Sequence, residues 1–165
     1  MMNPKKSSKE PSNGPERENE WSEVIRGERY IIRTSSAETN GVYAMLEVLA
    51  DPRNGVPVHV HDNVDEHFII LEGKAFIANG DRRAEVAAGS SITITRGVPH
   101  AWCNPSEDAP VRMLVIFSPG GLEELFRKHA TTEPAEMTAL ANKYGTRVTG
   151  PALFDNLYTL LSPRP

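Results

Sequence analysis

The sequence has one cysteine, Cys103, so it cannot form an internal disulfide. It also lacks a long apolar run, because none of its hydrophobic stretches approaches the roughly 20 residues that a membrane-spanning helix needs. The basic stretch MMNPKKSSKEP at the start is not followed by an apolar segment, so we expect no secretory signal. These absences agree with a reducing compartment, and we expect the protein to be cytoplasmic.

An excess of one charge sign is also missing. Lys and Arg number 18 and Asp and Glu number 22, which gives a net charge of −4 at pH 7. Such a balance gives no electrostatic reason to bind nucleic acid or an anionic membrane. We therefore expect neither as a partner, and a small-molecule ligand instead.

The length of 165 residues allows one domain with a sizeable core. Residues 1–20 contain no aliphatic or aromatic side chain apart from two methionines and are rich in Pro, Ser, Lys, Glu and Asn, which predicts a disordered tail. We expect a β-barrel over residues 21–119. Residues 120–165 are expected to form a helical extension packed on that barrel.

Short segments rich in β-branched and aromatic residues fill the central part, separated by Gly, Pro, Asn and Asp. Examples are ERYIIR, EHFIILEG, SSITIT and VRMLVIF. This pattern predicts about nine strands without intervening helices, and hence an all-β sandwich or barrel. The pair Asn79-Gly80 suits a tight turn, so the strands on either side of it should be antiparallel.

The strand pattern ends at Pro119. Beyond it, apolar residues follow the spacing of three and four that is typical of one helical face, in PGGLEELFRKHA and in TTEPAEMTALANKYG. Gly145 is a helix end signal. Two helices should therefore follow the sheet and gain their stability by packing on it.

Three of the five histidines lie close together in the stretch PVHVHDNVDEHFIILEG. On an extended strand, His59 and His61 point to one face while Val58 and Val60 point to the other. Glu66 begins the next strand, and a hairpin would bring it back beside both imidazoles. Imidazole nitrogens and a carboxylate form a ligand set for divalent Fe, Zn, Mn, Ni or Cu, so we expect one such ion per chain.

The alternative is that these histidines are unconnected surface or core residues. His100 favours a shared site, because it supplies a further imidazole from a distant strand–turn–strand segment. His67 has the opposite parity to Glu66, and His129 lies in a charged helical run, so neither is proposed as a ligand. Cys103 is interpreted as a small buried hydrophobic residue.

The first histidine segment resembles the first motif of the cupin superfamily. That motif has His-X-His, then three or four residues, a Glu, six residues and a Gly, and His59, His61, Glu66 and Gly73 match it. The second cupin motif is similar to the segment that begins at Gly89. The resemblance is greatest to single-domain, quercetin-dioxygenase-like cupins.

In the second motif, Gly97, His100 and Asn104 stand at the expected spacing. The sequence departs from the pattern twice. Arg53 stands where the first motif opens with Gly, and Thr95 stands where the second has Pro, which affects local turn geometry but no ligand position.

The resemblance covers about residues 28–126 and implies a double-stranded β-helix, or jelly-roll barrel, with C-terminal helices. It implies that His59, His61, Glu66 and His100 hold one metal ion near the barrel mouth. It also implies a homodimer, formed by sheet edges or by the strand around WSEVIRGERYIIR.

Residues that share parity with the ligands are expected to wall a substrate pocket. They are Phe68, Ile70 and Trp102, with Tyr43 and Met45 from the strand VYAMLEV. The alternative is that each of these residues is part of the core. These walls, with no glycine-rich phosphate loop nearby, favour a small aromatic or phenolic ligand over a phosphosugar.

The leading hypothesis is a mononuclear metal-dependent oxygenase in which Glu66 is a ligand and a catalytic base. Two alternatives remain open, because a fold does not fix a function. One is a redox-neutral isomerase or lyase in which the metal polarises a carbonyl group. The other is a cupin that binds a small molecule without turnover.

Overall fold

The computed structural model describes residues 20–129 and 136–153. The predicted tail over residues 1–20 therefore lies outside the described residues, apart from Glu20. The strands are β1 (Ser22–Ile25), β2 (Glu28–Thr34), β3 (Ala44–Ala50), β4 (Pro57–His61), β5 (Asp65–Glu72), β6 (Lys74–Asn79), β7 (Arg82–Ala87), β8 (Ser91–Ile94), β9 (His100–Cys103), β10 (Val111–Ser118) and β11 (Thr146–Ala152). The helices are α1 (Glu123–His129) and α2 (Met137–Lys143).

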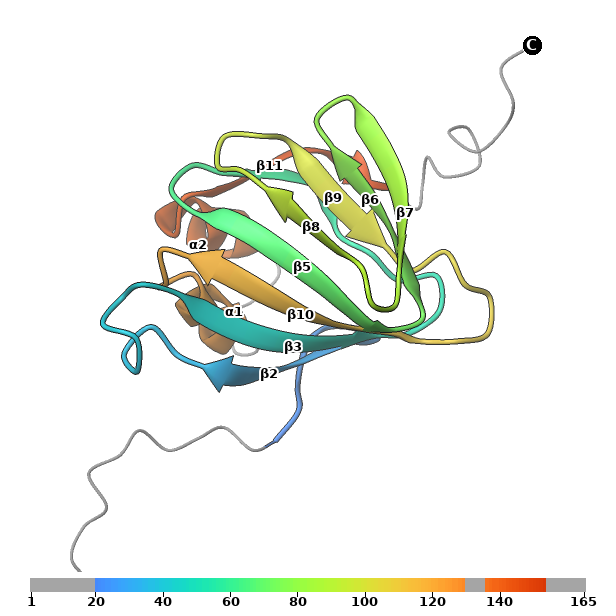
Figure 1. The fold of residues 1–165 in the computed structure, drawn as a ribbon. Helices are drawn as coiled ribbons and strands as arrows, with labels where there is room; N and C mark the ends of the chain where they lie inside the picture. Colours follow the sequence, from blue (N-terminus) through green and yellow to red (C-terminus); the bar gives the residue numbers. More distant parts are fainter. Residues whose placement is uncertain (1–19, 130–135, 154–165) are drawn as a thin grey trace, which may run out of the picture.

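The strands form two antiparallel sheets that face each other (Figure 1). One sheet has the order β1-β2-β3-β10-β5-β8, and the other has the order β11-β4-β9-β6-β7. Consecutive strands such as β4 and β5 lie in different sheets, so the chain winds from one sheet to the other. This arrangement confirms the predicted all-β jelly-roll barrel.

Alternation along the strands places the core between the two sheets. In β10, Val111, Met113, Val115 and Phe117 are buried, while the residues between them are partly exposed. Successive side chains of a strand point to opposite faces, so this row faces the interior. The largest fully buried apolar side chains are Phe68, Phe117, Leu46, Ile70, Ile77, Ile94 and Met113.

The Asn79-Gly80 turn joins β6 to β7 as an antiparallel hairpin, which confirms the prediction from that residue pair. Gly80 has a φ of 57°. This positive angle costs glycine little because it has no Cβ.

Two helices follow β10 as the spacing predicted, and Gly145, with a φ of 70°, comes soon after α2. The chain then forms β11, which the expected helical extension did not include. This strand pairs antiparallel with β4 at the edge of the five-stranded sheet. Its sequence, TRVTGPA, has little apolar alternation, so the periodicity that reveals other strands is missing here.

The turn before β4 keeps a glycine-like conformation without glycine. Arg53 has a φ of 58°, in the left-handed region that favours glycine. Gly55 follows it, and a Cβ there would lie 2.6 Å from the Cβ of Cys103 and 2.7 Å from the carbonyl oxygen of Trp102. The close approach of two backbone segments therefore requires Gly55.

Asn104 ties this turn to the loop before β10. Its side chain is 1% exposed, and its Nδ2 donates to the carbonyl oxygens of Ala50, Asp51 and Ala109 at 2.9–3.2 Å. Its Oδ1 accepts a hydrogen bond from the backbone N–H of Ser106 at 3.0 Å. Asn104 therefore has a structural role, since its side chain links backbone groups of the turn to those of the loop.

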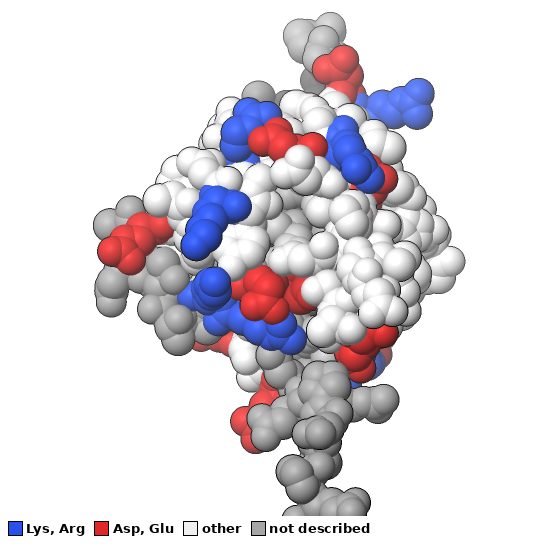
Figure 2. Space-filling view, turned by 90° about the vertical axis from the view of Figure 1, so that its left-hand side faces the viewer, with Lys and Arg blue, Asp and Glu red and all other residues white. Residues whose placement is uncertain are grey.

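Charged side chains of both signs lie close together on the end of the molecule where α1 and α2 are found (Figure 2). Two pairs near the loops are Arg147 with Asp62 at 2.7 Å and Arg96 with Asp65 at 3.0 Å. Within the described ranges, neither helix has the length or the apolar character to cross a membrane.

Candidate metal centre

Two adjacent strands bring the three histidines together. His59 and His61 project from the same face of β4, and the β4–β9 pairing sets His59 directly opposite His100. The ring centroids of His59 and His100 are 4.2 Å apart, and those of His59 and His61 are 4.8 Å apart. The predicted alternation on the strand thus gives a tight imidazole group.

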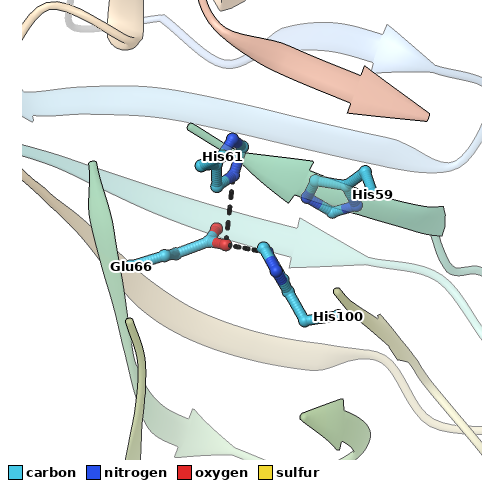
Figure 3. A group of neighbouring side chains, drawn as sticks. All are labelled: His59, His61, Glu66 and His100. Carbon is cyan, nitrogen blue, oxygen red and sulfur yellow. Dashed lines mark hydrogen bonds and ion pairs between the residues drawn. The ribbon is translucent and has the colours of Figure 1, made fainter. Parts of the chain in front are cut away.

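Glu66 reaches this group from the opposite sheet. We expected a hairpin between the two strands, but β4 and β5 do not pair with each other, because the loop between them crosses the barrel. The Glu66 side chain therefore spans the interior, with its Oε2 2.7 Å from His100 Nε2 and 3.3 Å from His61 Nε2 (Figure 3). Glu66 therefore meets the histidines as predicted, but it does so across the barrel and not through a hairpin.

The donor set fits a divalent transition metal. One ligand atom from each of His59, His61, Glu66 and His100 can be chosen so that all lie within 4.8 Å of one another. Donor atoms that sit about 2.1 Å from one ion are about 3–4 Å apart, so small side-chain movements would close this cluster around an ion. A buried carboxylate needs a positive charge beside it, and a metal ion would provide that charge while all three imidazoles stay neutral.

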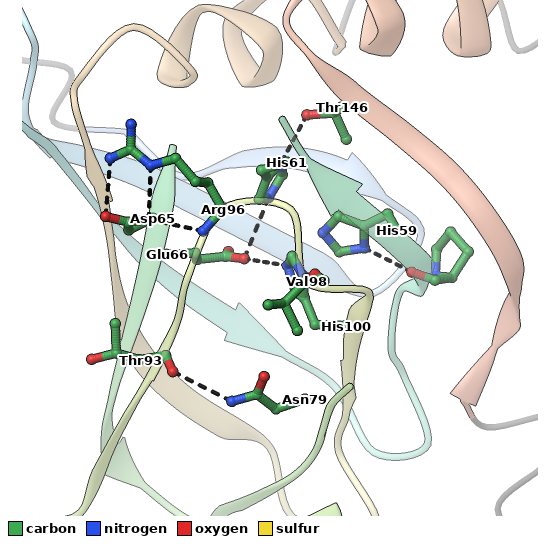
Figure 4. A network of polar contacts seen from close by, with 11 residues as sticks. His59, His61, Asp65, Glu66, Asn79, Thr93, Arg96, Val98, His100 and Thr146 are labelled. Atoms are coloured by element: carbon green, nitrogen blue, oxygen red, sulfur yellow. Dashed lines mark hydrogen bonds and ion pairs between the residues drawn. The ribbon is translucent and has the colours of Figure 1, made fainter. Parts of the chain in front are cut away.

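Hydrogen bonds on the outer side of each ring orient the imidazoles (Figure 4). His59 Nδ1 lies 2.8 Å from the carbonyl oxygen of Pro57, and His100 Nδ1 lies 2.9 Å from that of Val98. A carbonyl oxygen can only accept, so each Nδ1 carries a hydrogen, and when these rings are neutral each Nε2 has a lone pair that can bind an ion. This is the tautomer that a metal ligand requires.

The cluster also shifts the acidities of its members. Burial alone would raise the pKa of Glu66, but hydrogen bonds from His100 and His61 outweigh burial and hold the pKa well below its usual range. Burial likewise disfavours charged His100, yet the Glu66 carboxylate raises the pKa of His100 above its ordinary value. Burial, helped by nearby His100, lowers the pKa of His59 to about 4. His59 is therefore neutral and ready to bind metal near neutral pH.

Thr146 is a partner of the cluster that the sequence did not reveal. Its Oγ1 lies 2.9 Å from His61 Nδ1, and Thr146 begins β11, the strand that was not expected. The side chain of Thr146 is buried. It therefore fixes the rotation of the His61 ring from outside the histidine motif.

We predict that Thr146→Val weakens metal binding by about tenfold, since removing a hydrogen bond that orients a ligating histidine usually has an effect of that size. Titration of the purified variant with Zn²⁺ measures it. Thr149→Val, at an exposed position of the same strand, is the matched control and should leave affinity unchanged. Equal affinities for both variants would show that Thr146 does not support His61.

A cavity of about 180 Å³ lies beside the cluster. His59, His61 and Glu66 contribute to its surface, and most of the rest is apolar. The other lining residues are Val24, Ile25, Glu28, Val48, Val56, Pro57, Trp102, Val115, Phe117, Leu122, Leu125, Phe126, His129, Thr146 and Val148. An apolar cavity of about 150 Å³ can hold benzene, so this volume matches a ligand with one aromatic ring.

Of the five predicted wall residues, the structure places Trp102 on the cavity surface. Phe68 and Ile70 share the inward face of Glu66 but lie farther along β5, in the packed core. Tyr43 precedes β3 and is 37% exposed, while Met45 has the outward parity on that strand. The inward face of β3 is the even-numbered one, so its contribution to the cavity is Val48.

Glu28 is a wall residue that the sequence analysis missed. It shares the inward parity of Tyr30 and Ile32 on β2 and is only 3% exposed. The sequence signal for this wall residue is a carboxylate among the inward-facing positions of β2, which are otherwise aromatic or aliphatic.

Three residues that were not proposed as ligands, His67, Cys103 and His129, are also placed by the structure. His67 Nδ1 is 2.5 Å from Thr93 Oγ1, on the outer side of β5 and β8. Cys103 is fully buried, and burial raises the pKa of its thiol to about 11, so the thiol stays protonated. His129 lies at the end of α1 and lines the cavity.

The chain is similar in sequence and in fold to known proteins. The family model of the cupin domain matches residues 46–117. This segment is therefore similar to the cupin domain. All four residues of the candidate metal cluster lie inside the matched range.

Parts of the chain are also similar to two curated proteins. A segment of 55 residues is 40% identical to an uncharacterised protein of Streptomyces coelicolor, covering 33% of this chain and 50% of that protein. Another of 63 residues is 32% identical to mannose-1-phosphate guanylyltransferase 2 of Escherichia coli O157:H7, covering 38% of this chain and 13% of that enzyme. The chain thus spans half or less of the length of these relatives.

Solved structures share the fold. An RmlC-like cupin from Shewanella frigidimarina superposes with a TM-score of 0.57 at 17% identity, over 70% of this chain and 96% of that one. The polyketide cyclase RemF from Streptomyces resistomycificus gives a TM-score of 0.52 at 22% identity, over 60% of this chain and 72% of that one. These similarities agree with the cupin double-stranded β-helix.

Proposed function

We propose that the chain is a mononuclear, quercetin-dioxygenase-like cupin, a metal-dependent oxygenase that acts on a small aromatic or phenolic molecule. One observation carries the proposal. The His59, His61, Glu66 and His100 cluster borders an apolar cavity whose volume suits a single ring. Metal-binding groups and a place for an aromatic ligand are therefore adjacent.

The four side chains would hold one divalent ion per chain, which would supply a Lewis-acidic centre for dioxygen or for ligand oxygens. Phe117, Trp102 and Val115 would pack against the ring and exclude water from the reacting atoms. Glu66 serves first as a ligand, because its lowered pKa makes it a weak base alone. Its second carboxylate oxygen would accept a phenolic proton while the first binds the ion.

Elemental analysis of protein purified without added metal is the first test. The proposal predicts close to one transition metal ion per chain, and a content below about 0.1 per chain would contradict it. Oxygen uptake with mono- and dihydroxybenzenes is the second test. Consumption of oxygen with formation of an oxidised product supports the oxygenase.

The same assay distinguishes the other reaction classes. Product formation without oxygen uptake would point to redox-neutral isomerase or lyase chemistry, with the ion polarising a carbonyl group. A rise in melting temperature with a ligand that is never converted would indicate a binding protein. Either result would refute the oxygenase while keeping the metal site.

We also propose that the chain forms a homodimer through β1. This strand is the edge of the six-stranded sheet, and it carries the exposed Ile25, next to the exposed Trp21. Proteins usually cover such an edge, because its backbone groups can pair with another strand. Sedimentation of the full chain at micromolar concentration should show a dimer, and Ile25→Lys should shift it to a monomer. A monomeric wild type would end this proposal.

A further inference from the structure

Two buried side-chain atoms have no hydrogen-bond partner within the described part of the chain, and both belong to residues that line the same cavity. They are Oε2 of Glu28 and Nδ1 of His129. Buried polar atoms without a partner are rare in folded proteins, because each costs the free energy of its lost hydration. Their coincidence in one cavity suggests that the missing partner is a ligand.

Glu28 is the stronger of the two candidates. Its side chain is 3% exposed, whereas His129 is only half-buried. Glu28 lies on β2, where it pairs with Ala50 of β3 and with Ile25 of β1. Neither neighbouring side chain offers it a polar group.

The charge state of Glu28 fits a cavity that receives a neutral ligand. Burial, together with the nearby negative charge of Glu66, raises the pKa of Glu28 to about 7. Ion pairs satisfy other carboxylates of the barrel, such as Glu47, which pairs with Arg33 at 2.7 Å and also with Arg112. Among the described residues no cation pairs with Glu28, and its raised pKa favours the uncharged carboxyl group, which suits a neutral hydroxyl group.

We propose that Glu28 is a specificity-determining residue whose Oε2 accepts a hydrogen bond from a hydroxyl group of the ring-containing ligand. The ligand class is thereby narrowed to single-ring aromatic alcohols or phenols with one hydroxyl held at the β2 wall, away from the histidines. The assignment rests on the proposed function for the aromatic class of ligand. It does not depend on oxygen chemistry or on the presence of metal.

A wall residue of this kind would change the relative affinities of the cavity for ligands with and without a hydroxyl group. A site built to hydrogen-bond a hydroxyl discriminates against an analogue that lacks it, because the polar atom of the site is then left unpaired. Phenol and toluene form a matched pair of probes, since they have similar shapes and differ in one hydroxyl group.

The experiment measures the dissociation constants of phenol and toluene by isothermal titration calorimetry with the Zn²⁺-loaded chain and with the chelator-treated chain. Wild type should prefer phenol to toluene in both forms. Glu28→Met, which keeps the length of the side chain, should reduce that preference about tenfold, while Glu28→Gln, which retains an acceptor oxygen, should keep it. His129→Phe is the matched control and should also keep it.

Each contrary result overturns the assignment in its own way. An unchanged preference in Glu28→Met would mean that Glu28 does not contact the hydroxyl, and its loss in His129→Phe alone would move the contact to His129. A preference that vanishes on metal removal would place the hydroxyl on the ion, which would leave the proposed oxygenase intact. A wild type that favours toluene, or that binds neither probe, would refute the proposal without the use of any variant.

A failure of the oxygenase proposal would give a different result from a failure of the Glu28 assignment. If the chain consumed no oxygen with any phenol, a preference for phenol that depended on Glu28 would still stand in the calorimetric data.

Discussion

Replacement of His59 and His61 together by alanine will abolish metal binding by the chain. The two imidazoles supply half of the four-donor cluster, and both come from β4. Glu66 and His100 would remain as two ligands, too few to hold an ion against water. We expect affinity to fall on the order of 1,000-fold or more, and His100→Ala, which leaves three ligands, to lose about 100-fold.

Titration with Zn²⁺ at about pH 7.5, where free imidazole is neutral, measures both losses. His67→Ala is the control, because this histidine contacts Thr93 on the outer side of β5 and β8. If the double variant bound metal as well as wild type, or if His67→Ala were the damaging change, the proposed site would be wrong.

The same cluster should release metal in acid. A protonated imidazole cannot coordinate, and the raised pKa of His100 makes it the first of the buried histidines with a shifted pKa to gain a proton as pH falls. His59, whose pKa is lowered to about 4, stays neutral longer. Affinity should therefore fall steeply below about pH 6, and a titration at about pH 5.5 checks it.

Glu28→Gln should stabilise the metal-free chain at alkaline pH. The pKa of Glu28 is raised from 4.5 to about 7 in the folded state, so the folded state holds this proton more tightly than the unfolded chain does. Stability from this group is present in acid and is lost as pH rises through that interval. At about 1.4 kcal/mol for each pKa unit, the loss reaches roughly 3 kcal/mol by pH 8. Glutamine does not ionise, so the Glu28→Gln variant does not lose this stability.

Chemical denaturation of wild type and Glu28→Gln between about pH 5 and pH 8 would measure this difference. The advantage of the variant should be small at the acid end and should grow toward the alkaline end. Glu85→Gln, at an exposed carboxylate of β7, is the matched control and should show no growth of that size. If the stability advantage of Glu28→Gln did not change with pH, the pKa of Glu28 would not be raised in the folded state.

The β-rich fold and the grouping of the four candidate ligands were predictable from local patterns, whereas the jelly-roll topology came from the resemblance to cupins. Alternating side chains on a strand place His59 beside His61 whatever the rest of the chain does. The departure at Arg53 did not disturb the fold, since this residue adopts the left-handed φ of 58° that glycine would favour. Short sequence spacing therefore predicted which four side chains meet in the structure.

The cavity walls were harder to predict because they depend on which strands face each other. Choosing Tyr43 and Met45 placed the inward face of β3 one residue out of phase, and a shift of one residue moves every side chain to the other face. β11 could not be foreseen from its sequence, because it pairs with β4 through backbone hydrogen bonds and has little apolar alternation. Thr146 was missed for the same reason.

The location of β2, α1 and β11 has an evolutionary consequence. The four candidate metal ligands all lie within residues 46–117, whereas much of the cavity surface comes from chain segments before and after that range, including Glu28, Leu125 and Val148. Substitutions in the flanking segments can therefore reshape the ligand that is accepted without removing any metal ligand. If the proposed function is correct, its metal ligands and its ligand-selecting residues come from separate stretches of one polypeptide, and either set can change while the other is retained.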